Sequence, residues 1–347
     1  MTAGHDGAGD GVGPAPTAAL EGVRVVDFTQ VMLGPAATQM LADFGADVVK
    51  VERPGVGDLS RWSVGRHHDL DNPVFCSLNR NKRSIALDLR REEARQVALE
   101  LAAWADVLVE NFRPGVMERM GLGYRALADL NPRLVYASGT GFGSKGPNVA
   151  KGGQDVLAQA LTGVMHRRSD PAQPLSVYPT ALADYTAASH LAQAILVALL
   201  ARQRSGRGQR VEVSLYDAML AMQTQEGAAW MMRRQEVNWG AMPLTAVFET
   251  ADEPLVIVGA FREAPLSDLC RALGIDDLAG DPRFSDLDSQ RANVTELRAA
   301  LQEVFRSRTR AHWLQRLEEA DFLCAPVRSL DEALADPQTA CNGMVWE

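Results

Sequence analysis

Several common signals are missing from this 347-residue chain. Its four cysteines, Cys76, Cys270, Cys324 and Cys341, show neither a C-x-x-C spacing nor a paired pattern, which is typical of reduced thiols in an intracellular protein. No segment has the pattern of a secretory signal peptide, and no apolar run approaches the ~18 residues that a membrane-spanning helix needs. We therefore expect a soluble, cytoplasmic protein without a membrane anchor.

Positive charge is scarce and dispersed. Lys and Arg number 35 against 44 Asp and Glu, which gives a net charge of −9, and the basic residues form no stripe. A nucleic-acid-binding surface normally needs such a stripe, so we expect no nucleic-acid partner. An anionic ligand would require a local basic pocket.

The chain does contain a strong alternation of strand and helix patterns. "VRVVDFT" is typical of a buried strand, Pro35 opens an apolar helix, and "DVVKVE" predicts the next strand, which together form a βαβ unit. "RSIALDL", "REEARQVALELAAWA", "DVLVENF" and "PRLVYASGTGFG" continue the alternation. This pattern predicts an α/β fold in which helices cover a parallel, Rossmann-like sheet.

Length and composition divide the chain further. At 347 residues it exceeds the usual size of one domain, and the first residues are Gly, Ala, Pro and Asp with little to bury. We expect a disordered tail over 1–18, a large Rossmann-like domain over 19–205, a linker helix region over 206–240 and a smaller α+β domain over 241–325.

A nicotinamide cofactor is disfavoured despite this fold. The turn after the first strand reads "TQVMLGPAA" and lacks the G-x-G-x-x-G that lets a pyrophosphate approach the backbone, although Glu52 ends the second strand as an NAD-binding acid would. A fold by itself does not determine function.

Several motifs of the chain, taken in their order, resemble those of a known protein family. They are "LEGVRVVDFTQVMLGPAATQMLADFGADVVKVERPGVGD", "NRNKRSIALDL", "ADVLVENFRPGVMERMGLGY", "NPRLVYASGTGFG", "ALADYTAASHLAQAILVALLARQRSGRGQRVEVSLYDAML" and "FLCAPVRSLDEALADP". Together they resemble the class III coenzyme A transferases, a family that includes formyl-CoA transferase and carnitine CoA-transferase, and the related α-methylacyl-CoA racemases.

The resemblance implies an interlocked homodimer that uses an acyl-CoA and a carboxylic acid, with coenzyme A as substrate and no metal. Residues 326–347 would begin a return to the large domain. Family members continue beyond this point, so we expect the chain to be truncated.

Asp184 is the candidate catalytic residue. It lies in "ALADYTAA" at the start of a predicted helix, where an acid is commonly an N-cap or a first-turn residue stabilised by the helix dipole. In the resembled family the aspartate at this place is the nucleophile. A carboxylate with an ordinary pKa of ~3.9 is ionised at neutral pH and attacks a thioester without a partner base.

The resemblance also places a set of CoA-binding residues. For each Arg or Lys in this set, the alternative interpretation is an ordinary surface residue whose charge is solvated. Asn111 and Phe112 end a strand at the carboxyl edge, where open α/β sheets bind ligands. Met32 stands where formyl-CoA transferase commonly has Gln, which suggests a less polar acyl pocket. The expected CoA-binding residues are Val31, Met32, Arg53, Arg90, Asn111, Phe112, Arg119 and Lys151.

Racemisation is the first alternative. The resembled racemases pair the aspartate with a histidine in a "GHD" segment, whereas this chain has "GGQD", and the amide of Gln154 carries no proton at neutral pH. Asp155 either orients the site or is an ordinary first-turn helix acid. The balance favours CoA transfer.

A catalytically silent CoA-binding dimer is the second alternative. The presence of Asp184 argues against it. The segment "GAAWMMRRQEVNWGAMPL" is rich in Met and Trp and forms either an adaptable acyl site or part of a core.

Overall fold

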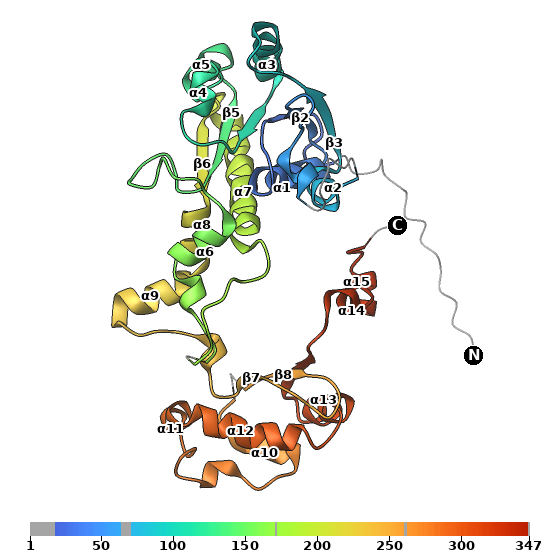
Figure 1. Ribbon diagram of the computed structural model, residues 1–347, viewed down its shortest axis with the longest axis vertical. Coiled ribbons are helices and arrows are strands. Elements are labelled where there is room, and N and C mark those ends of the chain that lie inside the picture. The colour runs from blue at the N-terminus through green and yellow to red at the C-terminus, as the bar shows by residue number, and fades with distance from the viewer. Residues whose placement is uncertain (1–17, 64–70, 171, 260–261, 346–347) are drawn as a thin grey trace, which may run out of the picture. The chain divides into compact units, whose positions relative to one another are not determined.

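The computed structural model of the protein describes residues 18–63, 71–170, 172–259 and 262–345 (Figure 1). The expected tail therefore lies outside the described residues, except for Ala18. The chain divides into two compact units, which are described separately. One comprises described residues up to His166 together with Ser176–Gly227, and the other comprises Arg167–Leu175 and the described residues from Ala228 onward.

A six-stranded sheet forms the centre of the large unit. All its strand pairs are parallel and the order is β3-β2-β1-β4-β5-β6, so the expected α/β fold is confirmed. The strand order reverses between β1 and β4, the point where open α/β sheets bind ligands. The strands are β1 (Arg24–Asp27), β2 (Asp47–Glu52), β3 (Lys82–Ala86), β4 (Val107–Glu110), β5 (Val135–Thr140) and β6 (Arg210–Ser214).

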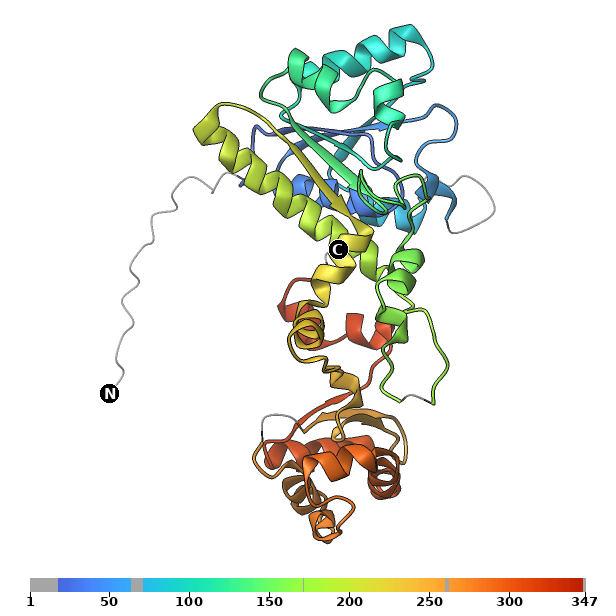
Figure 2. The same ribbon diagram turned by 90° about the vertical axis from the view of Figure 1, so that its left-hand side faces the viewer.

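Helices cover both faces of this sheet (Figure 2). Buried residues of α1 and α7 pack on one face, and those of α3 and α5 pack on the other. The helical segments are α1 (Leu33–Asp43), η1 (Leu59–Trp62), α2 (Pro73–Asn79), α3 (Glu92–Trp104), α4 (Val116–Arg119), α5 (Tyr124–Leu130), α6 (Asp155–Leu161), η2 (Val164–His166), α7 (Leu182–Ser205), α8 (Leu215–Met222) and α9 (Thr224–Arg233), the last of which runs from one unit into the other.

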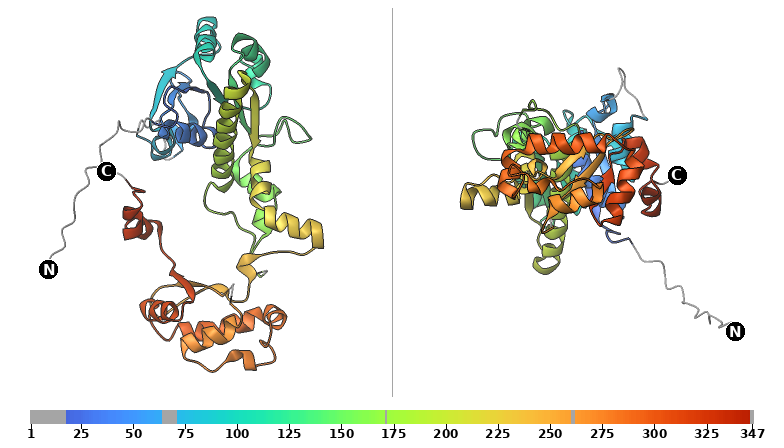
Figure 3. Two further views of the ribbon diagram at one scale, coloured as in Figure 1. Left: turned by 180° about the vertical axis from the view of Figure 1, so that it is seen from behind. Right: turned by 90° about the horizontal axis from the view of Figure 1, so that it is seen from below.

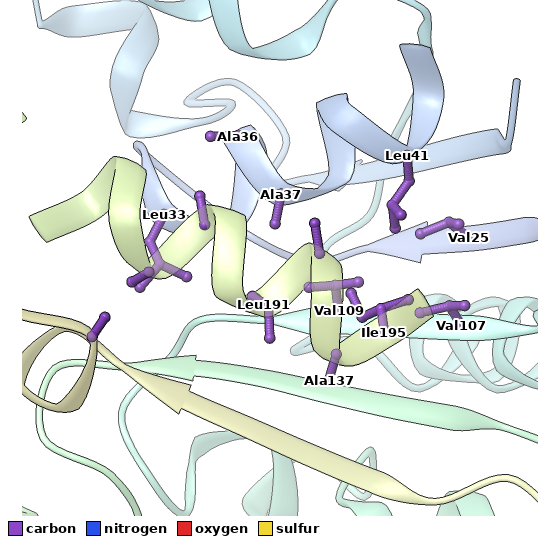
Figure 4. Packing of buried hydrophobic residues seen from close by; sticks show 14 of the residues in the cluster. Val25, Leu33, Ala36, Ala37, Leu41, Val107, Val109, Ala137, Leu191 and Ile195 are labelled. Atoms are coloured by element: carbon purple, nitrogen blue, oxygen red, sulfur yellow. The ribbon is translucent and has the colours of Figure 1, made fainter. Parts of the chain in front are cut away.

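The packing of α1 and α7 explains why the start of α7 is held in place. Leu191 and Ile195 of α7 are fully buried, between Ala37 of α1 and the strand residues Val109 and Ala137 (Figure 4). Burying a Leu or Ile side chain is worth about 1.5–3 kcal/mol relative to exposure. The helix that carries Asp184 is therefore anchored along its length to the central sheet.

Two expectations are refined by this unit. The βαβ unit predicted at the start of the chain is confirmed as β1, α1 and β2. β6 comes from the segment expected to link the domains, yet it pairs with β5 from Tyr136↔Arg210 to Thr140↔Ser214. The large unit therefore continues past residue 205, because this short strand completes the edge of the sheet.

Helix α7 is also long and apolar enough to cross a membrane by length and composition. This corrects the expectation that no segment reaches that threshold. A single helix of this kind is weak evidence for a membrane span, and the burial of Leu191 and Ile195 in the core accounts for its apolar character.

The small unit has its own antiparallel sheet and core (Figure 3). Its strands are β7 (Thr245–Phe248), β8 (Leu255–Val258) and β9 (Leu323–Pro326), in the order β7-β8-β9. Phe248, Phe305 and Trp313 are buried at its centre, with the two phenylalanine rings stacked at 4.6 Å between centroids. The remaining helical segments are η3 (Trp239–Ala241), α10 (Pro265–Leu273), η4 (Leu278–Gly280), α11 (Leu287–Ala292), α12 (Val294–Phe305), α13 (Arg310–Glu319), α14 (Leu330–Leu334) and α15 (Pro337–Cys341).

The exposed side chains of α9, in the Met- and Trp-rich segment, do not fit the interpretation that this segment is part of a core. No residue of α9 is buried, and Trp230, Met231 and Met232 are 53%, 74% and 79% exposed. These side chains therefore form no part of a core within the described chain.

Candidate functional site: a cleft at the carboxyl edge of the large sheet

A cleft of about 480 Å³ opens where the first, fourth and fifth strands end. Its walls come from the turn after β1, the turn after β4, the loop after β5 and the first turn of α7. This is the switch point of the strand order, where fold topology alone creates a crevice. The residues from the sequence analysis that line it are Val31, Met32, Asn111, Phe112, Lys151, Gln154 and Asp184.

Asn111 holds the turn after β1 in place. Its Oδ1 accepts the N–H of Gln30 at 2.8 Å and its Nδ2 donates to the Gln30 carbonyl at 2.8 Å. The next residue, Phe112, donates its N–H to Oε2 of Glu110 at 3.0 Å. Both turns of the cleft are thus tied to each other by one amide side chain.

Asp184 occupies the first turn of α7 without capping it. The N-cap is Ala181, which makes no side-chain cap hydrogen bond. The buried Oδ2 of Asp155 instead accepts the N–H groups of Ala183 at 2.7 Å and Asp184 at 3.0 Å. Because Asp155 satisfies these helix donors, the carboxylate of Asp184 is left to face the cleft, where the N–H of Leu33 donates to it.

The electrostatics of Asp184 are those of an under-stabilised carboxylate. Burial first, and then repulsion from Asp155, raises its pKa to about 6, while the Leu33 hydrogen bond acts in the opposite direction. The group is half-buried and still mostly ionised at pH 7. A perturbed acid in a cleft is a candidate catalytic group.

Close contacts at two glycines shape the cleft. A Cβ atom on Gly139 would lie 2.3 Å from Cδ2 of Leu33, and one on Gly141 would lie 2.3 Å from Cα of Gly153. A side chain at position 141 would require the backbone of Gly153 to move, whereas one at position 139 would displace the side chain of Leu33. The first glycine therefore lets Leu33 approach β5, and the second lets the 150s loop close over the strand end.

Among the residues that the structure describes, two cations line the cleft, and only one of them was expected. Lys151 was identified from the sequence, whereas Arg113 was missed. Its guanidinium lies against Gly152, since a Cβ there would be 2.8 Å from Nη2. The signal was its place in "VENFRPG", directly after the Asn-Phe pair.

Three expected CoA-binding arginines do not line this cleft. Arg53 is exposed in the turn after β2, and Arg119 is exposed at the end of α4. Arg90 is exposed and forms an ion pair with Asp88 at 2.8 Å. Their contacts with CoA therefore stay predictions.

The donor set of the cleft is not that of a metal site. Among the described residues, no group of three or more His, Cys, Asp or Glu side chains is placed to hold a metal ion. In the described part of the chain, the cleft instead combines one carboxylate, two cations and backbone donors, an arrangement suited to an anionic substrate with a reactive acyl group.

Comparison with known proteins agrees with this chemistry. The model of CoA-transferase family III matches residues 20–347. An acyl-CoA transferase from Fusarium pseudograminearum is 39% identical over 94% of this chain and 74% of its own length. The acetyl-CoA:oxalate CoA-transferase of Acetobacter aceti is 37% identical over 95% of this chain and 86% of its own.

A solved structure shows the same fold. The CAIB/BAIF family protein from Brucella suis superposes with a TM-score of 0.85 at 32% identity, covering 95% of this chain and 89% of that protein. The family match spans nearly the whole chain, and the two relatives named above are an acyl-CoA transferase and a CoA-transferase. This chain belongs to CoA-transferase family III and is an enzyme of that class, whose substrates are CoA thioesters.

Proposed function

We propose that this enzyme moves CoA from an acyl-CoA donor to a carboxylic acid acceptor, with Asp184 as the covalent nucleophile. The observation that carries the proposal is a carboxylate that lines the cleft, is offered a hydrogen bond by the Leu33 N–H and has an acid, Asp155, as its neighbour. A structural aspartate is normally paired or saturated with donors. Asp184 is instead available for reaction.

The first half of the cycle transfers the acyl group and then the CoA. A carboxylate oxygen of Asp184 attacks the thioester carbonyl, a C–O bond forms, and the C–S bond breaks with its electron pair on the CoA sulfur. The thiolate then attacks the Asp184 carbonyl carbon of this mixed anhydride. A C–S bond forms, the donor acid leaves as its carboxylate, and an aspartyl-CoA thioester remains.

The second half reverses these steps with a different acid. The acceptor carboxylate attacks the aspartyl thioester and releases the thiolate, which then attacks the acceptor carbonyl of the second anhydride. Acyl-CoA leaves and the Asp184 carboxylate is restored. The energy of the thioester is retained at every exchange, so no ATP and no metal enters, and no net proton is taken up or released.

The raised pKa of Asp184 suits this role. A pKa of about 6 keeps the group ionised at neutral pH and makes it a better nucleophile than an ordinary carboxylate, because basicity and nucleophilicity rise together. A thiolate, with an ordinary thiol pKa of ~8.5, is a good enough leaving group for such an attack.

The remaining residues of the cleft hold the substrates. Lys151 and Arg113 supply positive charge for the phosphates of CoA or the acceptor carboxylate, and Met32 gives the acyl pocket an apolar wall. Arg53, Arg90 and Arg119 are proposed to contact CoA outside the cleft.

We further propose that the enzyme is a cytoplasmic homodimer. The exposed Trp230, Met231 and Met232 of α9 support this proposal, because large apolar side chains gathered on one helix are commonly covered by a partner. Sedimentation equilibrium measures the mass directly, and a monomer at micromolar concentration contradicts the dimer.

The nucleophile is tested by trapping the intermediate. The wild-type enzyme is incubated with acetyl-CoA or succinyl-CoA without an acceptor, treated with hydroxylamine, and its peptides are analysed by mass. A hydroxamate is expected on the peptide that contains Asp184 and is absent in Asp184→Ala. Asp217, the first-turn acid of α8, provides the matched control, since Asp217→Ala should retain the adduct.

The alternatives give different results in the same assay. A racemase exchanges the α-hydrogen of the acyl group for deuterium from solvent without moving CoA. A silent CoA-binding protein forms no adduct and moves no CoA. Either result would reject the proposed transfer.

A further inference from the structure

The turn that leads into α1 contains an unusual backbone conformation. Val31 has a φ of 67°, in the left-handed region that a β-branched residue rarely adopts. Such a conformation costs free energy and persists only where surrounding groups impose it. Since Val31 lines the cleft, the groups that impose it bear on the site.

A buried ion pair supplies the restraint. Oδ1 of Asp58 accepts the N–H of Val31 at 3.0 Å, and its Oδ2 lies 2.8 Å from Nζ of Lys50. The same Nζ donates to the carbonyl of Thr29 at 2.8 Å. Lys50 and Asp58 are each 1% exposed. Together they bind the turn on both sides of Gln30, which Asn111 also holds.

The restrained turn ends at the hydrogen bond to the nucleophile. Leu33 follows Val31 by two residues, is the first residue of α1 and lines the same cleft as Asp184, and its N–H is the backbone donor that lowers the pKa of the Asp184 carboxylate. The segment from Val31 to Leu33 cannot shift without moving α1, because α1 is packed against α7 and the central sheet. A change in the backbone of Val31 must therefore move or reorient the Leu33 N–H.

We propose that the buried Lys50–Asp58 pair is a positioning element for catalysis: it holds Val31 in the left-handed conformation and thereby aims the Leu33 N–H at the carboxylate of Asp184. The inference rests on the proposed function, in which Asp184 is the nucleophile. Lys50 and Asp58 do not touch the reacting atoms. Their effect passes through the backbone of residues 29–33.

The cost of the pair argues for such a role. Two buried charges lose their hydration, and replacing an ion pair of this kind with apolar side chains is often neutral or stabilising. Stability alone therefore gives little reason for it. Asp27 and Lys82 are charged neighbours of the pair, with Lys50 Nζ 4.0 Å and Lys82 Nζ 3.1 Å from Asp27 Oδ2. Glu52 accepts the N–H of Asp58 at 2.9 Å, and Asp155 is the acid next to Asp184.

The first test uses Asp58→Asn in the full-length enzyme. Asparagine has one acceptor oxygen in place of two, so it cannot keep both the Oδ1 contacts with Val31 and Ser60 and the Oδ2 contact with Lys50. We expect kcat for CoA exchange to fall about 10- to 100-fold while KM for acyl-CoA changes less than about threefold, as displacement of a catalytic group does. The acid limb of the pH–rate profile should move upward by about one pH unit, because a hydrogen bond to the charged form lowers a pKa.

Rescue by glycine is the sharper test. Glycine adopts positive φ without a Cβ penalty, so Val31→Gly in the Asp58→Asn background should need less restraint. We expect the double variant to regain a large part of the lost kcat, and the double-mutant cycle to show coupling. Asp47→Asn, which breaks the exposed ion pair with Arg83, is the matched control and should leave the pH profile unchanged.

A double variant that neutralises both residues keeps the test valid if a single variant does not fold. Lys50→Met combined with Asp58→Asn leaves no unpaired buried charge at this pair. This double variant should therefore fold more readily than a variant in which only one of the two charges is removed. It should show the same loss of kcat as Asp58→Asn. A folded neutral pair with wild-type kcat and pH profile overturns the inference, as does an Asp58→Asn loss that Val31→Gly does not reduce.

The adduct assay separates this inference from the proposed function. If wild-type enzyme forms no adduct on Asp184, the proposed function fails and the inference fails with it. If wild-type forms the adduct and Asp58→Asn forms it at the wild-type rate, only the positioning role is overturned. A slower adduct in Asp58→Asn, restored by Val31→Gly, supports both.

Discussion

Two aspartates near the carboxyl edge of the large sheet have opposite surroundings. Asp27, which ends β1, is fully buried and bonded to Thr29, Thr38 and Lys82. Asp184, which begins α7, is half-buried, faces a cleft, and is offered one backbone N–H while an acid lies beside it. The two carboxyl groups are chemically identical, so the difference lies in their neighbours.

The neighbours change the two pKa values in opposite directions. Burial alone would raise the pKa of Asp27, but Lys50, Lys82 and two threonine hydroxyls hold it well below its usual range. Burial and Asp155 raise the pKa of Asp184 to about 6. A carboxylate saturated by donors is inert and stabilising, whereas one that lacks them stores free energy for reaction.

The largest expected effect concerns Asp184, the aspartate with few hydrogen-bond donors. In Asp184→Asn the nucleophile is lost, so the rate of CoA exchange should fall at least about 10³-fold while the dissociation constant for CoA changes less than about threefold. Isotope exchange between labelled CoA donors and acceptors measures the rate, and equilibrium dialysis measures binding. A rate within tenfold of wild type would remove Asp184 from the chemistry.

Asp27, the aspartate surrounded by donors, should instead contribute to the free energy of unfolding. Asp27→Asn breaks a buried pair with Lys82 and should lower the free energy of unfolding by about 3–5 kcal/mol at pH 7, compared with less than about 1 kcal/mol for Asp47→Asn on the surface. Because the folded pKa of Asp27 is depressed, its stabilisation is present above the unfolded pKa of about 4 and is lost as pH falls below it. Urea titrations at pH 7 and pH 3 test this, and equal losses for the two variants would contradict it.

The reverse sign is expected for the stability of Asp184→Asn. A folded pKa raised from 3.8 to about 6 means that wild type loses stability as pH rises through this interval. The upper limit is about 3 kcal/mol at 1.36 kcal/mol per tenfold, and partial exposure reduces it to about 1–2 kcal/mol. The variant should therefore be more stable than wild type at pH 8 and equal to it below pH 4. A destabilised variant at pH 8 would mean that the carboxylate is structural.

The smallest effect sharpens the contribution of Asp155. Asp155→Asn removes the neighbouring negative charge, so the pKa of Asp184 should fall and the acid limb of the pH–rate profile should move down by about half a pH unit to one unit. The rate at pH 7 should fall about tenfold, because the amide serves the Ala183 and Asp184 N–H groups less well than the carboxylate does. An acid limb that stays in place would show that burial alone perturbs Asp184.

Local patterns in the sequence were enough to predict the frame of the site. The apolar alternation around Val25 predicted a buried strand, Pro35 marked a helix start, and Asp184 was placed in the first turn of a long helix. Asn111 was placed at the carboxyl end of a strand, which the structure confirms. These features depend on neighbours a few residues away, which one sequence contains.

Contacts between distant segments could not be predicted. Arg113 rather than Arg53 or Arg119 lines the cleft, because loop paths decide which cation turns inward. The Leu33 N–H has no side-chain signature, and its partner Asp184 lies far along the chain. The pairing of Asp58 with Lys50 was equally invisible, since each residue by itself is typical of a solvated surface.

The amino-acid sequence by itself determined the parallel α/β frame and the place of an acid at the start of the buried helix, because periodicity and helix-start signals act over short stretches of chain. Only the tertiary structure decided that Asp155 and not Asp184 satisfies the helix donors, and that the Asp184 carboxylate is left in a cleft with a raised pKa. The physical reason is that burial and charge–charge distances are properties of segments brought together by folding.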